Sequence, residues 1–124
     1  MNAIVKIDIG LLILRVGFSG FLFLHGLEKL EIALSSNINY TDPIGLGPTL
    51  TLTLVLFTEL ICTVLVAVGY RVRWSSIPPI ILMLVAVFIV HKNDSIMEKE
   101  LAVLYLISFI VIGILGSGKY AIKK

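Results

Sequence analysis

Four apolar stretches, separated by short polar segments, constrain this chain more than any other feature of its sequence. They cover residues 7–30, 49–68, 77–91 and 98–115. An α-helix rises ~1.5 Å per residue, so about 20 residues cross a ~30 Å hydrocarbon core. The first two stretches reach this length alone, and the last two approach it with their flanking residues. We therefore expect an all-α fold, an antiparallel four-helix bundle inside a membrane.

The composition agrees with this expectation. Of the 124 residues, 58% are hydrophobic and 15% are charged, whereas a soluble domain carries about 25% charged residues. We expect a single transmembrane domain over residues 1–124 and no nucleic-acid partner. Lys6 and the small residues at 33–35 loosely fit a cleavable signal peptide, but Arg15 would interrupt the apolar core of that peptide and argues against it.

The distribution of lysine and arginine predicts the orientation of the helices. The N-terminus, the loop at 69–76 and the tail carry Lys6, Arg71, Arg73, Lys119, Lys123 and Lys124. The other two loops combine their lysines with most of the acidic residues. Because basic loops stay on the cytoplasmic side, we expect both termini in the cytoplasm.

Polar side chains line one face of the first stretch. In a helix, Arg15, Phe18, Leu22, His25 and Lys29 are spaced by three and four residues and therefore share that face. An arginine at the centre of a membrane helix costs ~2.5–3.5 kcal/mol on insertion scales. These groups must therefore face polar partners, water or the membrane surface.

Glu59 lies near the middle of the second stretch and is the natural candidate for such a partner. A lone carboxylate at that depth would be neutral or paired. The first two helices are expected to be antiparallel neighbours, which makes an Arg15–Glu59 contact reasonable. One interpretation is a structural ion pair that fixes the helix register. The other is a polar functional site inside the bundle.

A second polar group is expected at the outer end of the helices. His25 and His91 lie at similar depths on this topology, with Lys29 one turn beyond His25 and with Glu98 and Glu100 opening the fourth helix. Histidines and carboxylates are metal ligands, but these residues lack the HxxxH or ExxH spacing of a helical metal site. We predict no metal centre.

Two further side chains are candidates for a site inside the bundle. Tyr105 shares a face of the fourth helix with Ser108 and could point inward. Cys62, the single cysteine, lies one turn from Glu59. A buried lone cysteine usually serves as a small apolar filler, and this sequence excludes an intramolecular disulfide.

Several motifs recur in the order found in one known family. The quoted pieces are Arg15-x-Gly17; Phe23-Leu24-His25-Gly26-x-x-Lys29-Leu30; Asp42-Pro43-x-Gly45-Leu46-Gly47; Glu59-Leu60; Gly69 with Arg73; Val85-Ala86-x-Phe88-x-x-His91; Glu100-x-Ala102-x-Leu104-Tyr105; and Gly116-x-Gly118-Lys119-Tyr120. Together they resemble the DoxX family over nearly the whole chain. The resemblance implies a four-helix protein of the bacterial inner membrane, similar to the quinone-linked subunit of a thiosulfate-oxidising enzyme and associated with oxidoreductase complexes.

The first functional hypothesis is therefore a quinone-interacting subunit. A quinone headgroup needs hydrogen-bond donors and a route for protons. The predicted catalytic residues are Glu59, His25 and Arg15, and the predicted quinone-binding residues are His25, Lys29, His91, Glu100 and Tyr105. The sequence carries no motif for flavin, haem or iron–sulfur, so electrons would come from a redox partner protein or a soluble donor.

Two other functions fit the same sequence. The chain could be a non-catalytic scaffold or assembly partner, in which buried ions only specify packing; a homo-oligomer is compatible with either role. A transporter ranks last, because no glycine or proline interrupts the centres of the second and third stretches.

Overall fold

The computed structural model describes residues 2–35, 40, 42–97 and 99–123. Within these residues the fold is helical, with a single isolated backbone bridge between Tyr70 and Lys123. The predicted all-α class is confirmed. Glu98, which the sequence analysis expects at the start of the fourth helix, lies outside the described residues.

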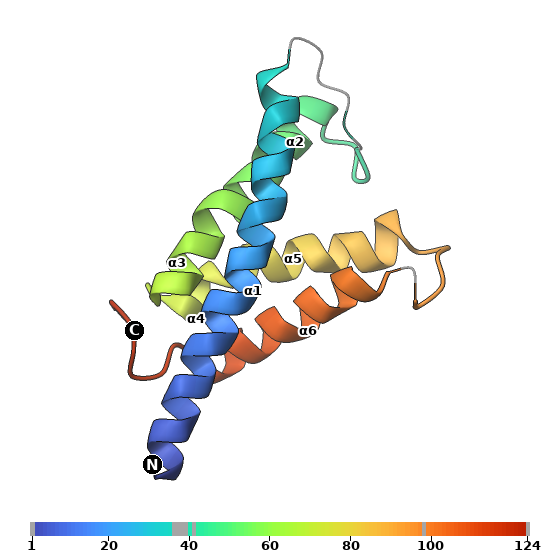
Figure 1. Cartoon of the computed structure of the whole chain (residues 1–124). Coiled ribbons are helices and arrows are strands. Elements are labelled where there is room, and N and C mark those ends of the chain that lie inside the picture. Colours follow the sequence, from blue (N-terminus) through green and yellow to red (C-terminus); the bar gives the residue numbers. More distant parts are fainter. Residues whose placement is uncertain (1, 36–39, 41, 98, 124) are drawn as a thin grey trace.

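Helix α1 (Ala3–Leu34) is the longest element. The side chain of Asn2 caps it by accepting a hydrogen bond from the Val5 amide at 2.9 Å. The helix exceeds the predicted 7–30 at both ends. Figure 1 shows it running the full height of the molecule, with the second helix packed against its upper part.

The second helix, Pro48–Val68, is one continuous rod in three parts, in which a π-helical segment separates two α-helical ones. Its parts are α2 (Pro48–Leu56), a π-helical segment η1 (Phe57–Cys62) and α3 (Thr63–Val68). Pro48 occupies the first helical position, where its missing N–H costs no hydrogen bond. Gly69 ends the rod in the left-handed conformation at φ +80°, which glycine adopts without steric cost.

The third helix, Val72–Val90, begins before the predicted 77–91 because its first part is the short helical turn α4 (Val72–Ser75). It continues as α5 (Ile77–Val85) and a second π-helical segment, η2 (Ala86–Val90). Ser76 precedes α5, but no side-chain cap forms. Its hydroxyl instead lies 3.5 Å from the Arg73 carbonyl.

Helix α6 (Glu100–Leu115) completes the set of apolar helices. The first three are long and apolar enough to cross a membrane, and α6 is a shorter apolar helix of 16 residues. Figure 1 shows α5 and α6 side by side, leaving the lower half of α1 at a wide angle. The described helices thus form two hairpins that splay apart on one side.

The buried core lies where the two hairpins meet. It contains Leu22, Val66, Val72, Met83, Val87, Tyr105, Leu106, Phe109 and Ile112. The outer faces of the helices expose many large aliphatic and aromatic side chains. Such extended apolar surface is unfavourable in water and matches a lipid environment.

Candidate functional site

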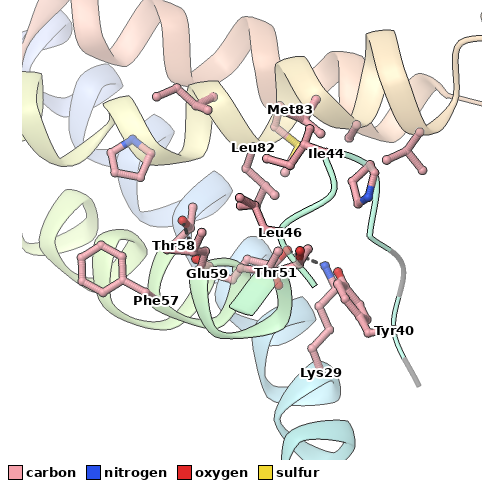
Figure 2. A pocket seen from close by; sticks show the side chains of 18 of the residues that line it. Lys29, Tyr40, Ile44, Leu46, Thr51, Phe57, Thr58, Glu59, Leu82 and Met83 are labelled. Atoms are coloured by element: carbon pink, nitrogen blue, oxygen red, sulfur yellow. Dashed lines mark hydrogen bonds and ion pairs between the residues drawn. The ribbon is translucent and has the colours of Figure 1, made fainter. Parts of the chain in front are cut away.

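A cavity lies between the second and third helices, on the side where the hairpins splay. Its volume is about 460 Å³, within the ~300–1,000 Å³ typical of ligand pockets. It is lined by Lys29, Tyr40, Pro43, Ile44, Leu46, Thr51, Leu54, Val55, Phe57, Thr58, Glu59, Pro78, Ile81, Leu82, Met83, Val85, Ala86, Val90 and His91. Figure 2 shows the ion pair at one end and Leu82 and Met83 on the opposite wall.

An ion pair forms the polar end of this pocket. The Lys29 ammonium donates to Glu59 Oε1 at 2.6 Å. The Glu59 side chain is 1% exposed and that of Lys29 is 29% exposed, so the carboxylate is buried and the ammonium borders the cavity. The second carboxylate oxygen, Oε2, is buried and has no hydrogen-bond partner among the described residues.

Gly26 makes this pairing possible. A Cβ at this position would lie 2.8 Å from Leu60 Cδ2 and 2.9 Å from Glu59 Cβ, closer than carbon atoms tolerate. The absence of a side chain lets α1 approach η1 at the level of Glu59. Lys29 lies one turn further along the same face, and its flexible stem brings the ammonium to the carboxylate.

The loop before the second helix folds over the pocket because the Asp42 carboxylate accepts hydrogen bonds from backbone amides further along the same loop. The Asp42 carboxylate accepts hydrogen bonds from Leu46 N at 2.9 Å and Gly47 N at 2.9 Å. It also accepts one from Thr51 Oγ1 at 3.1 Å. This arrangement fixes the turn and directs Ile44 toward the cavity. The Asp-Pro-x-Gly-Leu-Gly motif in the sequence therefore builds one wall of the pocket.

Both π-helical segments contribute to the pocket. Phe57, Thr58 and Glu59 belong to η1, and Ala86 and Val90 belong to η2. π-Helical turns inside α-helices are rare and are frequent at functional sites. Neither segment could be predicted from the sequence, because no glycine or proline marks them.

His91 lies at the end of η2 and lines the pocket. Its Nδ1 lies 2.8 Å from Asp94 Oδ2. This contact orients the ring and leaves Nε2 without an assigned partner among the described residues. The structure thus brings Lys29, Glu59 and His91 of the predicted site to one cavity.

His25, on α1, contacts Tyr105, on α6, on a side of α1 that does not face the pocket. Their rings meet edge to face with centroids 6.0 Å apart, and Tyr105 is buried. Tyr105 also contacts Phe18 edge to face at 6.0 Å. Glu59 lies within electrostatic range of both His25 and Tyr105. Neither ring lines the pocket. The inward direction predicted for Tyr105 is correct, but its side chain packs into the core and not into the pocket.

The expected contact between Arg15 and Glu59 is replaced by other interactions. The buried Arg15 guanidinium donates from Nη1 to the carbonyls of Val66 at 3.3 Å and Ala67 at 3.4 Å. Nη2 donates to the carbonyl of Tyr120 in the tail. Arg15 therefore holds the last turn of α3, where free carbonyls carry partial negative charge, and it does not line the pocket.

Glu100 also lies away from the pocket. It begins α6 and is exposed, which suits an acidic side chain in a first helical turn. Among the described residues, no group of three or more His, Cys, Asp or Glu side chains is placed to hold a metal. Of the lining residues, the sequence prediction named only Lys29, Glu59 and His91. Tyr40, Thr51, Thr58 and Met83 are among those it missed, and only the loop motif around Asp42 could have indicated the first two.

The long apolar helices define the class: this is a multi-pass helical membrane protein. A model of the DoxX family matches residues 10–92, more than half of the chain. The chain therefore belongs to the DoxX family, and the resemblance found in its motifs is confirmed. Neither the curated proteins nor the solved structures contain a match to it.

Proposed function

We propose that this protein binds a membrane quinone in the pocket between its second and third helices, as a subunit of an oxidoreductase complex in the bacterial inner membrane. One observation carries the proposal, namely that an ion pair forms one end of a largely apolar cavity between membrane-spanning helices. A hydrophobic molecule with a polar headgroup matches that lining, because apolar walls hold the body and a few polar groups orient the head.

The hydrogen-bonding groups of the pocket fit a quinone carbonyl. The Lys29 ammonium has three N–H donors, and one of them binds Glu59. The others can donate to a headgroup oxygen. Thr58 and Thr51 already donate their hydroxyl protons, to the Leu54 carbonyl at 2.9 Å and to Asp42 at 3.1 Å. Lys29 is therefore the main donor at this end of the pocket.

A quinone, when bound, supplies an acceptor of two electrons and two protons. The chain's own contribution is to position the headgroup and to handle protons. Lys29 would orient the headgroup, and the carboxylate of Glu59 would hold Lys29 in place. The unpartnered Oε2 of Glu59 can take up or release a proton. The aliphatic walls formed by Leu54, Ile81 and neighbouring residues would exclude water.

The remaining parts of the proposal concern topology and partners. The basic loops and tail favour a cytoplasmic position for both termini. The pocket would then open toward the outer half of the membrane, near Tyr40 and the turn at 42–47. Electrons would come from a partner redox protein bound to the helices or loops.

The proposal is tested by quinone binding to the purified protein. A short-chain ubiquinone analogue should raise the thermal stability of the protein in detergent. Losing a charge-assisted hydrogen bond costs ~1.5–3 kcal/mol, so Lys29→Met should weaken binding roughly 10- to 100-fold. Lys92→Met provides the matched control, because Lys92 is an exposed loop lysine. The quinone affinity of the Lys92→Met variant should equal that of the unsubstituted protein.

A second variant separates ligand binding from loss of stability. Ala86→Phe fills the pocket from η2 and leaves the Lys29–Glu59 pair in place, so it should abolish quinone binding in a folded protein. If the unsubstituted protein shows no quinone-dependent stabilisation, the quinone function fails. The scaffold function, with the ion pair serving only packing, then becomes the better explanation.

A further inference from the structure

Four cationic side chains gather at the end of the molecule opposite the pocket loop. Arg71 and Arg73 belong to the turn between the second and third helices, and Lys119 and Lys123 belong to the tail. All four are exposed. We call these four residues the cationic platform.

Backbone hydrogen bonds hold the two segments of the platform together. The Arg71 amide donates to the Lys123 carbonyl at 2.7 Å, and the Lys123 amide donates to the Gly69 carbonyl at 3.1 Å. The Arg73 guanidinium lies beside Gly116, since a Cβ there would be 3.5 Å from Arg73 Nε. The backbone of the platform is therefore fixed, although its two segments, 71–73 and 119–123, are about fifty positions apart in the sequence.

Arg71 adopts an unusual backbone conformation at the centre of this surface. Its φ of 45° makes it the one non-glycine residue with positive φ among the residues that the structure describes. Such conformations cluster at binding sites, where the surrounding structure holds them in place. Here the bond to Lys123 fixes the backbone, and the Arg71 guanidinium lies 6.0 Å from the centre of the Tyr70 ring.

The platform has little compensating negative charge. The ion pairs found in the described part of the chain are Lys29–Glu59 and His91–Asp94, and neither involves a platform residue. Asp8 approaches the tail, but its carboxylate accepts from the Lys119 backbone amide at 3.1 Å. The four cations thus remain available to an anionic partner.

The surroundings of the platform identify that partner as lipid. Val68 ends one membrane-spanning helix and Val72 begins the next, so the platform lies at the level where the spans leave the hydrocarbon. Trp74 and Ile122 are each 72% exposed. Tryptophan at this level inserts among lipid headgroups, and the adjoining acyl chains would cover the exposed Ile122 side chain.

We propose that the cationic platform binds the phosphate headgroup of an anionic phospholipid. Arg71 and Arg73 supply planar guanidinium donors suited to phosphate, and Lys119 and Lys123 add charge from the tail. Trp74 anchors beside the acyl chains. This site is separate from the quinone pocket and does not depend on it.

Native mass spectrometry of the full chain in detergent tests this site. Equimolar phosphatidylglycerol and phosphatidylcholine are added, and the lipid retained by the protein is measured. Phosphatidylglycerol should be retained preferentially, and the preference should fall as ionic strength rises. A lysine or arginine near an anionic surface contributes roughly a fivefold change in binding, so Arg71→Gln with Lys123→Gln should lower it about 25-fold.

Matched variants locate the site. Arg71→Lys keeps the charge and should retain most of the preference. Lys92→Gln removes an exposed cation from the opposite loop and should have no effect. Lys119→Gln with Lys123→Gln changes only exposed tail side chains, so it reports on lipid binding even if Arg71 variants fold poorly. Equal retention of the two lipids, or a preference that survives both double substitutions, would overturn the proposal.

Discussion

Replacing Lys29 by methionine should destabilise the protein more than neutralising its partner Glu59. The reason is the difference in burial, because the carboxylate is 1% exposed and the ammonium is 29% exposed. Lys29→Met leaves a buried carboxylate without its partner, and breaking a buried ion pair in this way costs about 3–5 kcal/mol. Glu59→Gln leaves an ammonium that can extend toward the headgroups on its flexible stem, and we expect a loss of about 1–2 kcal/mol.

The measurement is the free energy of unfolding in mixed micelles, combined in a double-mutant cycle. In the Glu59→Gln background, Lys29→Met should cost little, because no buried charge remains to be stranded. The reasoning is refuted if Lys29→Met costs the same in both backgrounds. It is also refuted if Glu59→Gln proves the more damaging of the two single substitutions.

Three further predictions concern the helix contacts. Gly26→Ala should destabilise the protein by about 1–3 kcal/mol, because the new Cβ would meet the Leu60 side chain at 2.8 Å. Gly17→Ala, which meets nothing within 4 Å, is the control and should be neutral or stabilising in the same unfolding assay. Gly69→Ala should loosen the tail because its φ is +80°, and limited proteolysis after the tail lysines should then accelerate. Arg15→Leu should free the same tail by removing its bond to the Tyr120 carbonyl, and amide hydrogen exchange over 119–123 should rise; unchanged exchange would contradict that role.

The helices themselves could be predicted from the sequence, because the length of an apolar stretch and its flanking proline or glycine are local properties. Pro48 begins the second helix and Gly69 ends it, as the sequence indicates. The family could be predicted as well, since its motifs occur in order along the chain. The angle between the two hairpins could not, because it depends on how side chains pack across the core.

The partner of Glu59 was predicted wrongly because sequence depth does not give the register between helices. Gly26 sets that register by allowing contact with Glu59, which leaves Lys29 as the nearest cation. Arg15 is eleven residues from Gly26, about 16 Å along the helix, so it reaches the end of α3. A search for small residues opposite Glu59 would have favoured Lys29.

The sequence does not show which α1 glycine another helix approaches. A Cβ at Gly10, Gly17 or Gly20 would meet nothing within 4 Å, whereas a Cβ at Gly26 would meet Leu60 and Glu59. Composition identifies small residues, whereas only the fold shows which of them another helix approaches.

The π-helical segment η1 allows the number of residues in the second helix to change. A π-helical turn accommodates a residue more than an α-helical turn, and each residue of an α-helix rotates the chain by about 100°. A one-residue deletion within Phe57–Cys62 could thus restore ordinary winding without breaking the rod. It would leave Val66 and Ala67 at nearly their present rotation about the axis, so their carbonyls would still face Arg15. A one-residue deletion at the start of α3 (Thr63–Val68) has no wide turn to absorb it, so it would rotate these carbonyls away from Arg15 and release the tail.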